Sequence, residues 1–247
     1  MDKAVISLSG GLDSTMLLMK LLSEGREVKA YSFDYGQSHT IELEKLEKNI
    51  LYLQSKGLPI THQVINLRDV FSDSQSSLCG NGDIPEGHYE DSNMKSTVVE
   101  NRNFIFSSII YGKALSWSKQ TNSNVSITLG IHAGDHTIYP DCTPESQEMA
   151  RELFRISNWG SEKVDYIAPF VNSTKGEVLE SGISAMNSMG FSDEDITYVL
   201  EHTHTCYSPD SNGKSCGKCG SCTERLEAFE YVGMKDPIKY QEQKKEP

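Results

Sequence analysis

The sequence predicts an α/β protein: a Rossmann-like parallel sheet with helices on both faces, followed by a small helical C-terminal segment. Three observations carry this prediction. Short apolar runs alternate with helical patterns, a glycine turn joins the first run to the first helix, and four cysteines crowd together near the C-terminus. The strand–helix–strand order implies parallel strands wound right-handedly. With 247 residues, of which 37% are hydrophobic, the chain can bury a sizeable core.

The first part of the chain alternates strand and helix. The turn after the first strand is Ser9-Gly10-Gly11, and Gly25 ends the first helix. We expect strands at residues 3–8, 28–33 and 61–67, and helices at residues 13–22 and 42–56.

A long polar stretch separates these elements from the rest. Residues 72–96 are rich in Ser, Gly, Asp and Asn, and they are too many for a routine connection, so we expect a lid, with disorder as the alternative. After it we expect helices at 102–119, 144–157, 175–189 and 223–231, a short helix after Gly190, strands at 124–131 and 164–168, and a polar loop at 132–142.

Charge and hydropathy argue against two kinds of partner. The chain has 35 acidic and 23 basic residues, a formal charge of −12, which opposes stable binding to nucleic acid and favours a small-molecule substrate. Its apolar runs are shorter than the roughly 20 residues that cross a bilayer. The N-terminus enters a strand-like run directly, without the pattern of a cleaved leader, which predicts a cytoplasmic protein without membrane contact.

The glycine turn is the first candidate site. Ligands of parallel α/β sheets bind beyond the carboxyl ends of the strands, where Ser9-Gly10-Gly11-Leu12-Asp13-Ser14 lies. The glycines allow close backbone approach, and the first turn of the helix offers unpaired N–H groups to an anion, so phosphate is the expected ligand. The alternative is a tight turn that Asp13 or Ser14 merely caps. The hexapeptide resembles the Ser-Gly-Gly-x-Asp-Ser signature of the N-type ATP pyrophosphatases, which cleave ATP between its α and β phosphates.

The cysteines form the second candidate site. Cys206, Cys216, Cys219 and Cys222 make a Cys-x9-Cys-x2-Cys-x2-Cys array, and four thiolates at this spacing suit a closed, structural, tetrahedral Zn²⁺ site. An iron–sulfur cluster would use the same ligands, and unconnected free thiols are the remaining alternative. Cys142 lies apart from the array and is expected to be a packing residue instead of a nucleophile.

Several motifs together resemble the 7-cyano-7-deazaguanine synthase family over nearly the whole chain. They are the two sites above with Phe33-Asp34-Tyr35-Gly36-Gln37, Arg102-Asn103, Tyr139-Pro140-Asp141-Cys142 and Thr205-Cys206-Tyr207. The resemblance implies an ATP-dependent ligase that converts 7-carboxy-7-deazaguanine and ammonia to 7-cyano-7-deazaguanine through adenylated intermediates, releasing AMP and pyrophosphate. It also implies ATP, Mg²⁺ and Zn²⁺ as cofactors, a homodimer, an ATP-pyrophosphatase-type domain at residues 1–190 and a zinc-binding subdomain at 191–247.

The resemblance also assigns roles to residues. Ser9, Asp13, Ser14 and Arg102 are the expected catalytic residues, and Arg102, Asn103, Tyr139 and Asp141 the expected substrate-binding residues. The residues expected to cradle ATP are Leu8, Ser9, Gly10, Gly11, Leu12, Asp13, Ser14, Thr15, Met16, Leu17 and Leu18. Arg102 would neutralise the substrate carboxylate or a phosphate, and Asp141 would accept hydrogen bonds from the deazapurine. The alternatives are a surface contact for Arg102 and a local turn for Asp141.

The chain departs from the family in one motif. Members usually carry Thr-x-Val-Pro-Gly-Arg-Asn, whereas here Glu100-Asn101 replaces the Pro-Gly pair. Asn101 can still adopt the left-handed conformation that Gly permits. Glu100 adds a negative charge that would weaken binding of a carboxylate substrate unless it points to solvent or is paired.

Histidines on the ligand side of the sheet are a weaker signal. His39 follows the second strand, and His132, Asp135 and His136 follow a later one, but Gly134 favours a loop over a helical metal site. Three alternative functions stay open: the same chemistry on another deazapurine in a phage or defence context, a tRNA base-modifying adenylating enzyme, and a non-enzymatic zinc-ribbon module on a degenerate nucleotide-binding fold.

Overall fold

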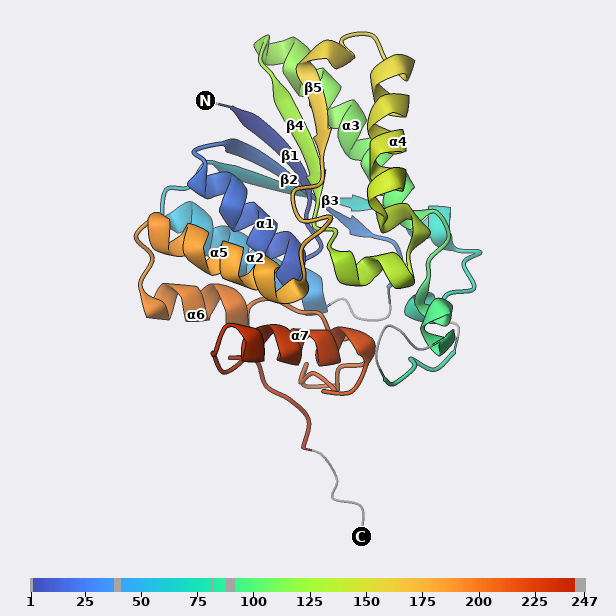
Figure 1. The fold of residues 1–247 in the computed structure, drawn as a ribbon, viewed down its shortest axis with the longest axis vertical. Helices are drawn as coiled ribbons and strands as arrows, with labels where there is room; N and C mark the ends of the chain where they lie inside the picture. Colours follow the sequence, from blue (N-terminus) through green and yellow to red (C-terminus); the bar gives the residue numbers. More distant parts are fainter. Residues whose placement is uncertain (1, 38–40, 81, 88–91, 243–247) are drawn as a thin grey trace.

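A five-stranded parallel sheet forms the centre of the molecule (Figure 1). The structure is a computed structural model that describes residues 2–37, 41–80, 82–87 and 92–242. The strands are β1 (Lys3–Ser7), β2 (Glu27–Asp34), β3 (Ile60–Asn66), β4 (Val125–Leu129) and β5 (Val164–Ile167). Their order across the sheet is β3-β2-β1-β4-β5. The central position of β1 places the turn that follows it in the middle of the carboxyl edge.

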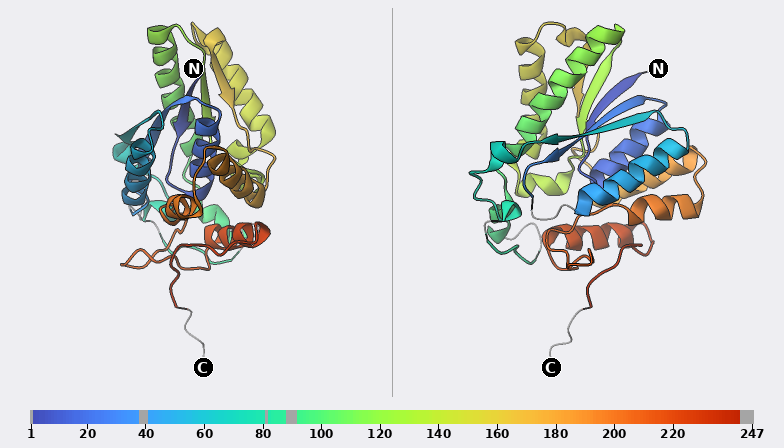
Figure 2. Two further views of the ribbon diagram at one scale, coloured as in Figure 1. Left: turned by 90° about the vertical axis from the view of Figure 1, so that its left-hand side faces the viewer. Right: turned by 180° about the vertical axis from the view of Figure 1, so that it is seen from behind.

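Helices cover both faces of the sheet, as the sequence predicts (Figure 2). They are α1 (Leu12–Ser23), α2 (Ile41–Ser55), α3 (Arg102–Thr121), α4 (Pro144–Ser157), α5 (Lys175–Ser188), α6 (Asp193–Glu201) and α7 (Gly220–Tyr231). Helices α1, α2, α5 and α6 lie on one face and α3 and α4 on the other, while α7 lies across the carboxyl edge (Figure 1). None of the helices in the described part of the chain is long and apolar enough to span a bilayer.

Each face of the sheet has its own core. Leu17 and Met16 of α1, both fully buried, pack with Leu179 of α5 on one face. Tyr111 and Trp117 of α3 pack against the other face. The two cores hold β1 rigidly from both sides, because alternate residues of a strand point to opposite faces of the sheet.

The structure differs from expectation in one element type and in one helix boundary. The loop expected at 132–142 contains two 3-10 turns, Ala133–Thr137 and Pro140–Cys142. The first begins with a capping box: the His132 Nδ1 accepts from the Gly134 N–H, and the Asp135 carboxylate accepts from the His132 N–H. The last helix begins at Gly220, so Cys222 lies inside its first turn.

The polar stretch at 72–96 is partly ordered by 3-10 turns. These turns are Ser77–Cys79 and Ser92–Thr97. Leu78 in the first turn and Met94 in the second are buried. Leu78 lines the central cavity described below, so part of this stretch covers it. Residues 81 and 88–91 of the stretch, and His39, lie outside the described residues.

Candidate active site

The turn after β1 is shaped for close approach to a ligand. Gly10 has φ +90°, and a Cβ there would lie 2.9 Å from the Glu42 carbonyl oxygen, so only glycine fits. The Ser9 Oγ lies 3.0 Å from the Ser14 Oγ and accepts a hydrogen bond from the Gly11 N–H. Ser9, Gly11, Asp13 and Ser14 all line one cavity at the carboxyl edge of the sheet. This arrangement can receive an anion with N–H and O–H donors.

A second glycine, Gly130, lets the chain after β4 pack on this turn. A Cβ at Gly130 would lie 2.8 Å from both the Cα and the N of Ser14. No side chain fits there, so the β4 edge of the cavity is in backbone contact with the first turn of α1. The cavity therefore has a fixed width between β1 and β4.

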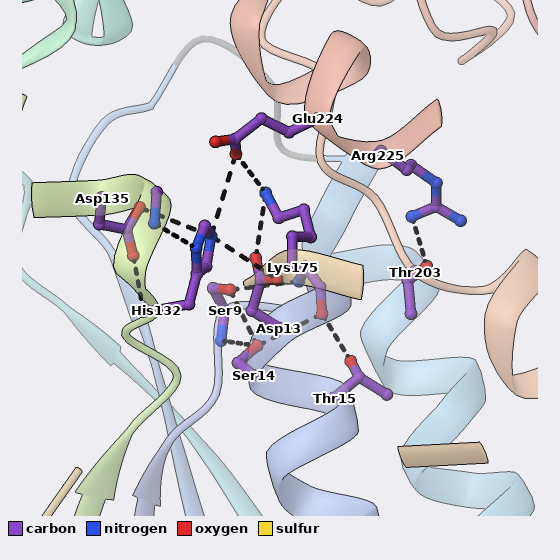
Figure 3. Close-up of polar contacts among 12 residues, drawn as sticks. Ser9, Asp13, Ser14, Thr15, His132, Asp135, Lys175, Thr203, Glu224 and Arg225 are labelled. Atoms are coloured by element: carbon purple, nitrogen blue, oxygen red, sulfur yellow. Dashed lines mark hydrogen bonds and ion pairs between the residues drawn. The ribbon is translucent and has the colours of Figure 1, made fainter. Parts of the chain in front are cut away.

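Five buried or partly buried ionisable groups meet beside the turn (Figure 3). The Lys175 Nζ lies 2.9 Å from the Glu224 Oε2 and 3.5 Å from the Asp13 Oδ2. The His132 Nε2 lies 3.8 to 3.9 Å from carboxylate oxygens of Asp13, Asp135 and Glu224. Because the His132 Nδ1 is an acceptor, its Nε2 carries the proton and faces these carboxylates. We refer to these five residues as the charged cluster.

The carboxylates of the charged cluster favour the protonated, cationic form of Lys175. Burial by itself lowers the pKa of Lys175, but the carboxylates of Asp13, Glu224 and Asp135 outweigh it and the pKa is raised. Lys175 therefore keeps its charge throughout the physiological range. The Asp13 Oδ1 is buried without a hydrogen-bond partner among the described residues. Such an orphaned oxygen is costly unless a ligand or cation completes it.

The opposite side of the cavity carries Arg102. Its guanidinium lies 5.7 Å from the ring centre of Tyr35 and 6.0 Å from that of Tyr139, and it donates to the Tyr35 hydroxyl at 3.4 Å. Burial raises the pKa of Tyr35 to about 12, so this hydroxyl stays neutral. The Asn103 Oδ1 accepts from the Arg102 Nε at 3.2 Å. No carboxylate forms an ion pair with Arg102 among the described residues, so its charge is available to an anionic ligand.

The departure at residues 100–101 leaves this geometry intact. Asn101 has φ +55°, the left-handed conformation expected of it. Glu100 is exposed and does not line the cavity. Its Oε2 accepts from the Ser74 Oγ at 2.6 Å and its Oε1 from the Gln75 N–H at 3.4 Å, and these bonds lower the pKa of Glu100. The additional carboxylate is thus bound by Ser74 and Gln75 of the 72–96 stretch, outside the cavity lining.

The structure brings only some of the expected site residues to the cavity. Lining it are Leu8, Ser9, Gly11, Asp13, Ser14, Arg102, Asn103 and Tyr139. Leu12, Met16, Leu17 and Leu18 are buried in the core, and the Thr15 hydroxyl donates to the Gly11 carbonyl at 2.8 Å. Asp141 is outside the lining, and its carbonyl accepts from Gln147. Roles for these residues in ATP or substrate binding stay predictions.

Residues from distant parts of the chain complete the lining. They include Phe33, Tyr35, Glu42, Phe106, Leu129, Gly130, Ile131, Asp135, Lys175, His204, Thr205, Tyr207 and Ser221. Sequence reasoning gave Lys175 and Glu42 no role, because each looks like an ordinary charged residue at the start of a helix. The signal that existed was position, since both follow a strand at the carboxyl edge.

Cys142 is in the lining but is unsuited to nucleophilic attack. It is 2% exposed, and burial raises the pKa of its thiol well above the ordinary value. Its sulfur accepts from the Asn103 Nδ2 at 3.4 Å. This agrees with the expected packing role.

The four clustered cysteines meet as a metal site requires. Their sulfurs lie within 4.8 Å of one another, and all four residues are buried. Cys216 and Cys222 have sulfurs 3.9 Å apart, close to the ~3.8 Å edge of a tetrahedron with Zn–S bonds of ~2.3 Å. The Cys216 sulfur accepts from the Lys218 and Cys219 N–H groups, and the neighbouring cysteines together with the Lys218 N–H lower the pKa of Cys216. The cluster is therefore compatible with a bound metal.

The fold and the cavity together define an α/β protein with a Ser-Gly-Gly-x-Asp-Ser turn at the centre of the carboxyl edge of a parallel sheet. Comparison with known families makes this specific. The chain belongs to the family described as "Queuosine biosynthesis protein QueC", whose profile matches residues 3–233. It is therefore a member of a family of synthases.

Curated relatives are similar over almost their whole length. The chain is 42% identical over 241 residues to the 7-cyano-7-deazaguanine synthase of Marinomonas sp. (strain MWYL1), covering 97% of this chain and 99% of the relative. It is 41% identical to the enzyme of that name from Hahella chejuensis, covering 97% and 94%. A solved 4-thiouridine synthetase in complex with RNA and ATP aligns at 16% identity and a TM-score of 0.44, covering 94% of this chain and 50% of that one.

Proposed function

We propose that this protein is a 7-cyano-7-deazaguanine synthase. It joins ammonia to 7-carboxy-7-deazaguanine and dehydrates the amide to the nitrile, with ATP cleaved to AMP and pyrophosphate at each step. The observation that carries the proposal is that one cavity connects the Ser9–Ser14 turn to Arg102. The phosphate-binding turn and the free guanidinium therefore face the same ligand space.

The chemistry needs positioned charge more than a protein nucleophile. The substrate carboxylate oxygen attacks the α-phosphorus of ATP and pyrophosphate leaves; ammonia then attacks the acyl carbon and AMP leaves. In the second round the amide oxygen attacks the α-phosphorus of a second ATP and pyrophosphate leaves; loss of both N–H protons and of AMP then leaves the nitrile. The turn donates to the phosphates, Arg102 pairs with the carboxylate, and Lys175 offsets the acidic groups so that a polyphosphate can approach.

Two metals belong to this proposal. Asp13, with Asp135 and Glu224 beside it, offers hard oxygen ligands and an orphaned buried oxygen, which suit Mg²⁺. When bound there, Mg²⁺ neutralises charge on the phosphates. Cys206, Cys216, Cys219 and Cys222 would hold Zn²⁺ as a closed structural site. A homodimer and a cytoplasmic location are also part of the proposal, and light scattering measures the former.

Product analysis tests the proposed function. Wild type incubated with ATP, ammonium and 7-carboxy-7-deazaguanine is expected to yield AMP, pyrophosphate and the nitrile by mass spectrometry. Asp13→Asn is expected to lower the rate of AMP formation by 100-fold or more, since removal of one preorganised charge at a reacting group costs about 10²–10³. Asp165→Asn, an exposed site on β5, is the matched control and keeps the rate. Formation of ADP instead of AMP would refute the proposal.

A further inference from the structure

Glu42 is a carboxylate of the cavity that the chemistry above does not use. It lies in the first turn of α2 and lines the cavity with Ser9 and Arg102. Its carbonyl oxygen is the atom that a Cβ on Gly10 would strike at 2.9 Å. Glu42 is therefore fixed beside the phosphate-binding turn, on the side toward Arg102.

A buried glutamine orients the Glu42 carboxylate. Gln37, 4% exposed, donates from its Nε2 to the Glu42 Oε1 at 2.9 Å and to the Phe33 carbonyl at 3.2 Å. Its Oε1 accepts from the Tyr35 N–H at 2.9 Å. Both ends of this amide are thus tied to the backbone at the end of β2, at Phe33 and Tyr35, which leaves it one orientation and fixes the carboxylate.

The surroundings of Glu42 make it a stronger base than an ordinary carboxylate. Burial raises the pKa of Glu42 to about 7, although the Gln37 hydrogen bond and the Arg102 charge both lower it. Gln37 and Tyr35 from the loop after β2 and Arg102 from α3 are the polar and charged groups around it. No basic side chain forms an ion pair with Glu42 among the residues that the structure describes. The carboxylate can therefore receive a small cation.

The proposed reaction consumes ammonia, which at neutral pH is almost wholly ammonium and has no lone pair to attack with. Its site must therefore bind a small cation and remove one proton. The carboxylates of Asp13, Asp135 and Glu224 are unsuitable, because they face Lys175 and His132 and are the ligands proposed above for Mg²⁺.

We propose that Glu42, oriented by Gln37, is the ammonium-binding site and the base that converts ammonium to ammonia. This inference rests on the proposed function. One N–H proton passes from ammonium to the Glu42 carboxylate, and the freed electron pair forms the C–N bond to the adenylated carbonyl carbon. The bond from that carbon to the AMP oxygen breaks, and AMP leaves with the electron pair. The second proton lost from nitrogen and the proton on Glu42 return to solvent, which resets the site.

Glu42→Gln tests the inference, because the new side chain keeps an oxygen for the Gln37 hydrogen bond and removes the base. At pH 7 we expect the KM for ammonium to rise at least 10-fold. The defect should shrink toward pH 9, where free ammonia is more abundant. Hydroxylamine, which is mostly unprotonated at neutral pH, should react with the variant nearly as fast as with wild type. Exchange of labelled pyrophosphate into ATP, measured with the carboxylated substrate and without ammonium, should stay within 3-fold of wild type.

Controls separate this role from a structural one. Glu44→Gln removes the same charge from an exposed site on the same helix and should leave the ammonium KM unchanged. Glu42→Asp keeps a carboxylate and should recover part of the ammonium dependence. Circular dichroism establishes that the variants are folded.

Each other outcome overturns the inference in a recognisable way. An unchanged ammonium KM in Glu42→Gln shows that Glu42 is not the site, while the proposed function stands. If Glu42→Gln loses pyrophosphate exchange and hydroxylamine reactivity as strongly as it loses activity with ammonium, Glu42 only shapes the phosphate-binding turn. If wild type forms no AMP from the carboxylated substrate, the proposed function fails and this inference fails with it.

Discussion

Arg102, which is half-buried, lies among tyrosines and forms no ion pair with a carboxylate of the described residues. Its two aromatic neighbours and the Tyr35 hydroxyl offset part of the cost of burying the charge without neutralising it. A planar group held in this way can make two parallel hydrogen bonds to a carboxylate. The specificity of the proposed enzyme for an anionic acceptor is therefore expected to depend on this residue.

Arg102→Met is expected to weaken binding of the carboxylated deazapurine about 10- to 100-fold, because hydrogen bonds to a charged group contribute about 1.5–3 kcal/mol. The KM for ATP should change much less. Steady-state kinetics with each substrate varied in turn measures both values. Lys119→Met, at the exposed end of the same helix, is the control. A parallel rise in both KM values would instead assign Arg102 to the phosphates.

Glu42 also makes the free energy of unfolding depend on pH, in a direction that follows from its raised pKa. Its pKa is about 7 in the folded protein against an ordinary 4.5, so the folded state holds the proton longer than the unfolded state. The contribution of Glu42 to the free energy of unfolding is therefore full below pH 4.5 and declines as the pH rises to 7, by up to about 3 kcal/mol.

Glu42→Gln removes this decline. In urea unfolding, the variant is expected to gain stability relative to wild type between pH 5 and pH 8, since Gln stays neutral while Gln37, Tyr35 and Arg102 keep their positions around it. If the free energies of unfolding of Glu42→Gln and wild type differ by the same amount at pH 5 and at pH 8, the pKa of Glu42 is not raised.

At the scale of elements, the sequence was enough to predict local helices, strands and turns. It was not enough to predict contacts between residues that are distant in the sequence and meet only after folding. Apolar periodicity and glycine position were enough for β1, the turn and α1, and Pro144 marked the start of α4 correctly. Lys175 and Glu224 lie 49 residues apart and meet only because α7 crosses the carboxyl edge. Nothing in either local pattern reports that contact, so the charged cluster could not be predicted.

Helix α7 is held in place by a buried ion pair. Arg225, fully buried, makes two hydrogen bonds to the Asp236 carboxylate, at 2.7 and 3.0 Å, and a third to the Thr203 hydroxyl at 2.8 Å. The bonds join α7 to the segment that follows α6 and to the chain beyond the helix. The orientation of Glu224, the preceding residue, depends on them.

Arg225→Ala is expected to lower the free energy of unfolding by about 3–5 kcal/mol, because it leaves Asp236 buried and unpaired. Arg155→Ala is the matched control: it removes the exposed pair with Glu152 on α4 and should cost less than about 1 kcal/mol. Urea unfolding of both variants measures the difference. Comparable losses would show that α7 is not held by this pair.

At the scale of the whole molecule, the C-terminal segment and the sheet share one site. The Gly10 carbonyl accepts from the His204 N–H at 2.9 Å, and Thr205, Tyr207 and Ser221 line the cavity. Cys206 and Cys222 belong to the same stretch of chain. Residues on both sides of the domain boundary expected at residue 190 thus line the same cavity.

Loss of the metal is therefore expected to disturb ATP binding as well as stability. Cys222→Ser should reduce the bound zinc measured by elemental analysis and should lower the melting temperature. It should also weaken the affinity for ATP, measured by calorimetry, at least 10-fold, because Glu224 and His204 lose their support. Cys79→Ser, outside the cluster, should change none of these. Unaltered ATP affinity in a zinc-free protein would show that the segment holds its position without the ion.

The hydrogen bond from His204 to Gly10 has a consequence for biosynthesis. Every strand of the sheet emerges from the ribosome before residue 204, yet the Gly10 carbonyl is bound by a residue that follows them. A nascent or prematurely terminated chain that has folded its sheet still lacks His204, Thr205, Tyr207 and Ser221 of the cavity lining. The proposed adenylation, whose intermediates would be lost to water on an unfinished protein, is therefore expected only after translation has passed the last cysteine.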